Sequence, residues 1–84
     1  MTKLNLSFND LKSIKGMRIL KNLTFLDLSY NILRRLSKVI GNLINLIYLN
    51  LQNDLLRELP KEIGNLINLK YWNLYHNYLV ELPK

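Results

Sequence analysis

Leucine and other apolar residues recur at fixed positions along the whole chain. Four short segments alternate apolar and polar residues: Leu4–Asn9, Leu26–Asn31, Leu49–Asp54 and Trp72–Asn77. Their first residues lie 22, 23 and 23 positions apart. Alternation with a period of two places the apolar side chains on one face of a strand. The pattern therefore predicts four short strands, one in each repeated unit.

The segments between these strands repeat as well. Residues 40–46 read Ile-Gly-Asn-Leu-Ile-Asn-Leu and are repeated without change at 63–69, and Leu-Pro-Lys at 59–61 is repeated at 82–84. The spacing of Ile40, Leu43 and Leu46 predicts a helical or 3₁₀ turn. The first unit is one residue short between Ile14 and Leu20, so we expect an irregular turn there. One unit cannot bury its apolar face alone, whereas stacked units bury a continuous core.

These segments follow L-x-x-L-x-L-x-x-N-x-L and then L-P-x-x-I-G-x-L, and the chain thereby resembles the leucine-rich-repeat family with 23-residue repeats. The resemblance implies an α/β fold, a right-handed leucine-rich-repeat solenoid. A four-strand parallel sheet would form its concave face, and short helical or 3₁₀ turns would form its convex face. We expect a single domain over residues 1–84, with about three and a half repeats that start near positions 4, 26, 49 and 72.

One polar position recurs after each predicted strand and is occupied by Asn9, Asn31, Asp54 and Asn77. In the family that the chain resembles, the asparagine at this position forms a structural column joining neighbouring turns. An amide suits the role because it donates and accepts hydrogen bonds, whereas an ionised Asp54 only accepts. We expect a tolerated substitution in a strained or hydrated column. A pH-sensitive or ligand-binding carboxylate is the alternative.

Aromatic residues gather on the face of the predicted sheet that points away from the core. Seven of the eight aromatic residues, all except Trp72, lie outside the inward-facing leucine positions. Aromatic side chains are enriched at the energetic centres of interfaces. Cross-strand packing that stiffens the sheet would also explain them. The candidate residues for binding a protein or peptide on the concave face are Phe8, Phe25, Asp27, Tyr30, Tyr48, Asn50, Gln52, Tyr71, Asn73, Tyr75 and His76.

The net charge of +6 favours an acidic partner without identifying one. Most basic residues follow the strands or lie on the convex turns: Lys12, Lys15, Arg18, Lys21, Arg34, Arg35, Lys38, Arg57 and Lys61. A solvated surface is the plainer interpretation, and binding of an anionic polymer is an alternative function. Nucleic acid is the less favoured partner, because no nucleic-acid-binding motif accompanies the charge.

The composition argues against several other classes. The chain has no cysteine, which excludes disulfides, thiol catalysis and thiolate metal sites. Its first residues lack the apolar stretch of a signal peptide, and no stretch approaches the ~18 apolar residues that cross a bilayer. We therefore predict a cytoplasmic or otherwise intracellular chain. The single His76 has no partner set, and we expect no enzyme activity, catalytic residue, cofactor or metal.

Both ends of the predicted solenoid lack the polar capping units that such folds normally carry. Leu4, Trp72 and Leu82 are the candidate residues for association through the end faces. Trp72 occupies a position held by leucine in the other units, so we expect it to point into the core. The sequence favours a homodimer formed through uncapped ends, and a fragment of a longer array is the alternative.

Overall fold

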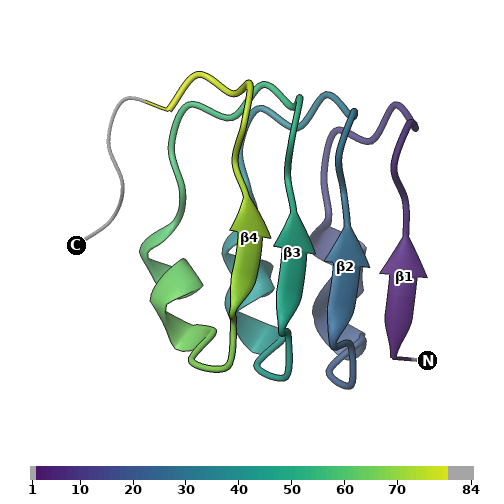
Figure 1. Ribbon diagram of the computed structural model, residues 1–84, viewed down its shortest axis with the longest axis vertical. Coiled ribbons are helices and arrows are strands. Elements are labelled where there is room, and N and C mark those ends of the chain that lie inside the picture. Colours follow the sequence, from purple (N-terminus) through teal and green to yellow (C-terminus); the bar gives the residue numbers. More distant parts are fainter. Residues whose placement is uncertain (1, 80–84) are drawn as a thin grey trace.

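The computed structural model describes residues 2–79, with four parallel strands on one side and three 3₁₀ helices on the other (Figure 1). The strands are β1 (Lys3–Asn5), β2 (Phe25–Asp27), β3 (Tyr48–Asn50) and β4 (Tyr71–Asn73), and they are adjacent in chain order. The helices η1 (Lys15–Ile19), η2 (Lys38–Asn42) and η3 (Lys61–Asn65) follow the first three strands. Each of the first three units is therefore one strand, a turn and a 3₁₀ helix, and successive units stack side by side. No helix in this part of the chain is long and apolar enough to cross a membrane.

The register of the sheet follows the repeat. Leu4 pairs with Leu26, Leu26 with Leu49, and Leu49 with Trp72. Backbone hydrogen bonds extend the ladder past the ends of the strands, where the Leu28 and Leu51 amides each donate to the following unit at 2.8 Å. The four parallel strands that the alternating pattern predicts are confirmed.

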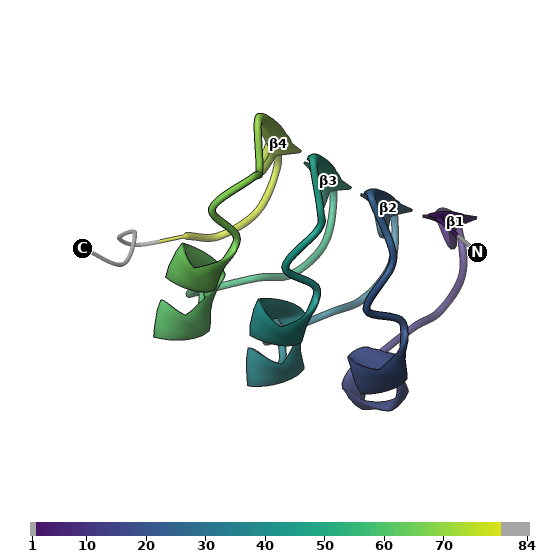
Figure 2. The ribbon, with the colours of Figure 1, turned by 90° about the horizontal axis from the view of Figure 1, so that it is seen from below.

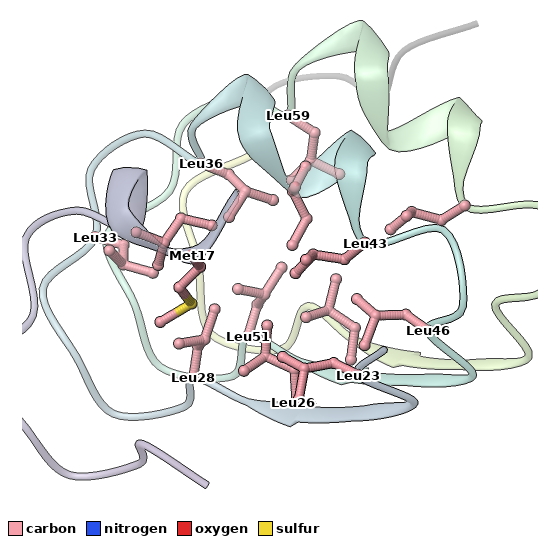
Figure 3. Packing of buried hydrophobic residues seen from close by; sticks show 14 of the residues in the cluster. Met17, Leu23, Leu26, Leu28, Leu33, Leu36, Leu43, Leu46, Leu51 and Leu59 are labelled. Carbon is pink, nitrogen blue, oxygen red and sulfur yellow. The ribbon is translucent and has the colours of Figure 1, made fainter. Parts of the chain in front are cut away.

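The core lies between the sheet and the 3₁₀ helices, where leucines of successive units, among them Leu26, Leu36 and Leu51, point toward one another (Figure 3). The inward strand residues Leu26 and Leu49 are fully buried, as are Ile40, Leu43 and Leu46 from the second helical turn. Burial of one such side chain contributes about 1.5–3 kcal/mol. Because the same positions are filled in each unit, the core is continuous from one unit to the next.

The 3₁₀ helices begin in two different ways. Ser37 precedes η2 in an extended conformation, and its hydroxyl accepts a hydrogen bond from the Val39 amide at 3.4 Å. In the first unit, Ile14 occupies the preceding position with φ −117° and ψ 20° and makes no side-chain capping bond. The helix η1 has five residues like the other two helices. The irregularity of the first unit therefore lies at Ile14, where the chain enters η1.

Gly41 allows η2 and η3 to pack closely. A Cβ atom at Gly41 would lie 2.8 Å from the Glu62 Cβ and 2.9 Å from the Glu62 carbonyl oxygen. Gly64 is the equivalent residue of the next unit, and nothing within 4 Å would meet a Cβ there. The first glycine is thus required by the packing between units, and the second is not constrained by any described residue.

The asparagine column joins neighbouring units as the family resemblance implies. The Asn31 Oδ1 accepts a hydrogen bond from the Leu11 amide at 3.1 Å, and its Nδ2 donates to the Leu6 and Leu28 carbonyls at 3.0 Å. Asn77 repeats this arrangement one turn after Asp54. Each amide satisfies backbone groups of its own unit and of the preceding one, which a buried turn requires.

Asp54 keeps the accepting bond of this arrangement and lacks the donating ones. Its Oδ1 accepts from the Leu33 amide at 3.1 Å, whereas its Oδ2 is buried and has no hydrogen-bond partner. Burial raises the pKa of Asp54 to about 6, although the backbone hydrogen bonds from Leu33 and Asn31 lower it. The carboxylate therefore strains the column at the place where its repeat neighbours carry an amide.

Candidate partner-binding surface

One face of the sheet lies opposite the 3₁₀ helices (Figure 2). Because the middle residue of β2 and of β3 is buried, the residues on either side of it form two columns on this outer face. The pairing register places Lys3, Phe25, Tyr48 and Tyr71 in the first column, and Asn5, Asp27, Asn50 and Asn73 in the second. The residue between them in each strand turns inward. The sheet therefore brings the strand residues among the candidate set onto one surface.

The first column is largely aromatic. The Phe25 and Tyr48 rings stack with their centroids 4.4 Å apart and an interplanar angle of 3°. Both side chains are half-buried, whereas Tyr71, the next residue of the column, is 63% exposed. The stack gives the sheet a rigid apolar centre, and Tyr71 extends that centre into solvent.

The side chains of the second column form hydrogen bonds with the backbone. The Oδ1 atoms of Asn5, Asp27, Asn50 and Asn73 each accept a hydrogen bond from the amide two residues later, at 2.9, 2.9, 3.0 and 2.9 Å. Such side-chain turns hold the chain as it leaves a strand. The amide of Asn73 also donates to the Gln52 Oε1 at 3.2 Å. These candidate residues therefore have a local structural role, which alternation alone does not reveal.

A third column flanks the sheet and comprises Phe8, Tyr30, Asn53 and His76, each with a φ of 57°. This left-handed conformation is uncommon for residues other than glycine. The Phe8 and Tyr30 rings stack at 4.4 Å, and the Tyr75 and His76 rings meet at 5.0 Å with an interplanar angle of 60°. This repeated turn places the exposed side chains of Phe8, Tyr30 and His76 just beyond the strands, whereas Asn53 is half-buried.

Residues 22–43 match the family model of the Leucine Rich Repeat. This segment is thus a leucine-rich repeat. The matched residues run from just before β2 to just after η2, so they comprise one complete strand, turn and 3₁₀ helix. The other strands pair with β2 or with its neighbour in the same register. No curated protein matches the sequence significantly.

Trp72 differs from the sequence-based expectation for a leucine-rich-repeat core. It lies in the inward register position, paired with Leu49, yet it is 44% exposed. The reason is positional, because β4 is the last described strand and only β3 pairs with it. Leu4, in the first strand, is half-buried, and Leu82 lies outside the described residues.

Trp72 lines an open hollow of about 360 Å³ on this end face. The walls of the hollow are largely apolar, with Ile63, Leu66 and Leu69 beside Trp72, and Lys61 and Lys70 also line it. This hollow lies on the side of η3 and β4 where a further repeat would stack in a solenoid.

Apart from Lys3, the basic residues of the described chain lie outside the strands. Lys12, Lys15, Lys21, Arg34, Arg35, Lys38, Arg57 and Lys61 are all exposed. Within the two outward columns of the strands, by contrast, Lys3 and Asp27 are the charged residues. Among residues 2–79, no group of three or more His, Asp or Glu side chains is placed to hold a metal ion.

Proposed function

We propose that this leucine-rich-repeat chain binds a protein or peptide on the outer face of its sheet, the face that the sequence predicts to be concave. Members of the family generally mediate protein–protein interaction and are typically not enzymes. In Figure 2 the 3₁₀ helices are spread further apart than the strands, which supports this curvature. The outer face of the sheet is thus the surface on which we expect protein–protein interaction.

The observation that carries the proposal is the aromatic group on this face. Tyr71 and Tyr75 are 63% and 70% exposed, and Tyr71 pairs with Tyr48 of the half-buried stack that Phe25 and Tyr48 form. Tyrosine offers a large apolar ring and a polar tip, which is the chemistry of interface centres. A partner that covers these rings gains apolar burial at about 25 cal/mol per Å² before the costs of association.

Selection from a random 12-residue peptide library on the immobilised chain tests the proposal. Enriched peptides are then measured against Tyr71→Ala and Tyr75→Ala by fluorescence anisotropy. We expect each variant to weaken binding about five- to thirty-fold, in line with 1–2 kcal/mol for an interface aromatic. Ile67→Ala is the matched control, because Ile67 is an exposed apolar residue that lies outside the strands, within the repeated segment at 63–69. Equal losses for Ile67→Ala and the tyrosine variants would argue against the sheet face.

As a second candidate, we propose that the end face around Trp72 docks a second copy of the chain. The repeated sequence at 40–46 and 63–69 supports this idea, because in the first copy Gly41 is covered by the following unit. In the second copy Gly64 is open and borders the hollow beside Trp72. The same apolar surface is thus covered by a unit of this chain in one place and uncovered in the other.

Size-exclusion chromatography with light scattering over a concentration series tests this second candidate. We expect a dimer that dissociates in the Trp72→Glu variant and persists in Ile67→Glu, which places the same charge outside the hollow. A monomer at every concentration would refute the docking of a second copy. That result would leave the proposal for the sheet face intact, since the two surfaces share no residue.

A further inference from the structure

The segments that follow the strands form a surface of their own beside the sheet. They run next to one another at the edge where the arrows of Figure 1 point. The amide of Ile32 donates to the Leu11 carbonyl at 3.1 Å, and the amide of Leu55 donates to the Leu33 carbonyl at 2.9 Å. The buried Leu33 and Leu56 mark the inward positions. We call the outward surface of residues 8–12, 30–34, 53–57 and 76–79 the flank.

Outward residues on the flank form three columns of different chemistry. The column nearest the sheet is Phe8, Tyr30, Asn53 and His76, the middle column is Asp10, Ile32, Leu55 and Tyr78, and the outer column is Lys12, Arg34 and Arg57. The stack of Phe8 on Tyr30 lies in the first column. In the middle column, Ile32 and Leu55 are half-buried and Tyr78 is 65% exposed. The three cations of the outer column are exposed.

Charge distinguishes the flank from the outer face of the sheet. A second row of exposed cations, Lys15, Lys38 and Lys61, begins the three 3₁₀ helices a few residues after the outer column. Asp10 and Glu58 are the exposed acidic residues in this region of the described chain. Cations repeated at the spacing of stacked units, about 4.8 Å between neighbouring parallel strands, give a continuous positive edge. Such an edge attracts and orients an acidic segment.

We propose that the flank is a second docking surface, which binds an extended peptide segment of a partner protein with alternating acidic and apolar residues. A peptide that crosses the units over Ile32 and Leu55 directs successive side chains to opposite sides. Its carboxylates then face Arg34 and Arg57, and its apolar side chains face Tyr30 and the middle column. Guanidinium groups bind carboxylates through two parallel hydrogen bonds, which favours carboxylates at these two positions.

The apolar middle column argues for a peptide over a nucleic acid. A phosphodiester backbone is neutralised by Lys and Arg without need of the half-buried Ile32 and Leu55. An acidic peptide with apolar side chains uses both the cations and these two residues. The flank contains no strand residue and does not include Tyr71, and the two surfaces meet where the Tyr75 and His76 rings lie 5.0 Å apart.

A synthetic ten-residue peptide with strictly alternating Glu and Leu or Phe, carrying a fluorescent label, is the probe. Binding is followed by anisotropy in low salt, against a peptide of the same composition with its glutamates in one block and against oligo(dT). We expect the alternating peptide to bind at least about five-fold more tightly than either competitor, because only it matches both columns. Equal binding of the block peptide or of oligo(dT) would show a general preference for polyanions and overturn the proposal, as would no binding of the alternating peptide at about 1 mM.

Two charge-reversal variants place the peptide on the chain. Arg34→Glu with Arg57→Glu should weaken binding about ten-fold or more, since each interface charge contributes a few-fold and reversal adds repulsion. Lys21→Glu with Lys70→Glu makes the same change of charge at exposed residues outside the flank, and it should change binding less than about two-fold beyond the general charge effect. Circular dichroism confirms that both double variants fold.

Tyr71→Ala separates this proposal from the proposed function of the sheet face. Binding of the alternating peptide should be unchanged in Tyr71→Ala, because Tyr71 lies in a strand column away from the flank. If Tyr71→Ala weakens binding and reversal at the arginines does not, the peptide occupies the sheet and the flank proposal is wrong. Equal effects of the two charge-reversal pairs would likewise reject the flank as the binding surface.

Discussion

Replacing Asp54 with asparagine should stabilise the protein. The Asp54 side chain is 2% exposed, and its Oδ2 is buried without a hydrogen-bond partner. At the equivalent place in the preceding unit, the Asn31 Nδ2 donates to three backbone carbonyls, at 3.0, 3.0 and 3.2 Å. Asp54→Asn supplies the missing donor and removes a buried negative charge, and it leaves Oδ1 to accept from the Leu33 amide as before.

The size of the effect follows from the pKa of Asp54. Burial raises that pKa from 3.8 to about 6, so the folded protein holds the proton more tightly than the unfolded chain does. The stability contributed by this proton is fully present below about pH 4 and is lost as the pH rises through about 6. At 1.36 kcal/mol for each pKa unit, the loss approaches about 3 kcal/mol at pH 7. Mutational studies of buried polar groups that lack a hydrogen-bond partner give a cost of about 1–3 kcal/mol. This range agrees with the value obtained from the pKa.

Urea unfolding of the wild type and of Asp54→Asn between pH 4 and pH 7.5 tests this reasoning. We expect the variant to be more stable by about 2–3 kcal/mol at pH 7, and the difference to shrink toward pH 4 as Asp54 of the wild type becomes protonated. The difference between the two proteins is the useful quantity, since it cancels the titration of groups that they share. For a domain of this size, it corresponds to roughly 10 °C or more in Tm at neutral pH.

Asn31→Asp is the matched control, because it places a second carboxylate in the same column. It should lower the free energy of unfolding at pH 7 and add a pH dependence of the same sign as that of Asp54. A variant Asp54→Asn that is less stable than the wild type at pH 7 would refute the reasoning. So would a stability difference that stays constant from pH 4 to pH 7.5.

Three further predictions follow from the packing. Gly41→Ala should lower the free energy of unfolding by about 1–3 kcal/mol in thermal unfolding, because its Cβ would lie 2.8 Å from the next unit. Gly64→Ala should be close to neutral in the same experiment, because no described residue would meet a Cβ there. Leu49→Ala should cost about 2–5 kcal/mol in urea unfolding, since this side chain is fully buried in the core. A double-mutant cycle of Phe25→Ala and Tyr48→Ala should give a coupling of about 0.5–1.5 kcal/mol for the stacked rings; a coupling near zero would contradict the stack.

Much of the fold could be predicted from the repeat. Alternation of apolar and polar residues predicts the strands, and the sheet pairs Leu26 with Leu49 in the register that the alignment implies. The 3₁₀ turn around Ile40 is present and buried, and the Asn31 side chain donates to the Leu6 carbonyl of the preceding unit. These features depend on local periodicity and on the stacking of equivalent units, which a single sequence displays directly.

The sequence could not predict which polar atoms of the candidate site residues are free to bind a partner. Alternation correctly places Asn50 and Asn73 on the outer face, but their Oδ1 atoms are occupied by backbone amides two residues later. The left-handed conformation at Tyr30 and His76 could not be predicted either, because neither residue is a glycine. Both features arise from how the chain leaves each strand, and the side chains that result are as polar or aromatic as a binding residue would be.

By itself, the sequence determined the repeated unit, the inward leucines and the register of the sheet, because a period of two in each strand and about 23 residues in each unit leave few other ways to bury those side chains. The tertiary structure decided which outward groups remain free. It placed a half-exposed Trp72 at an inward position, and it brought Ile32 and Arg34 of one unit beside Leu55 and Arg57 of the next on the flank. The physical reason is that exposure depends on the neighbours that stacking brings together, and those neighbours are about a full repeat apart along the chain.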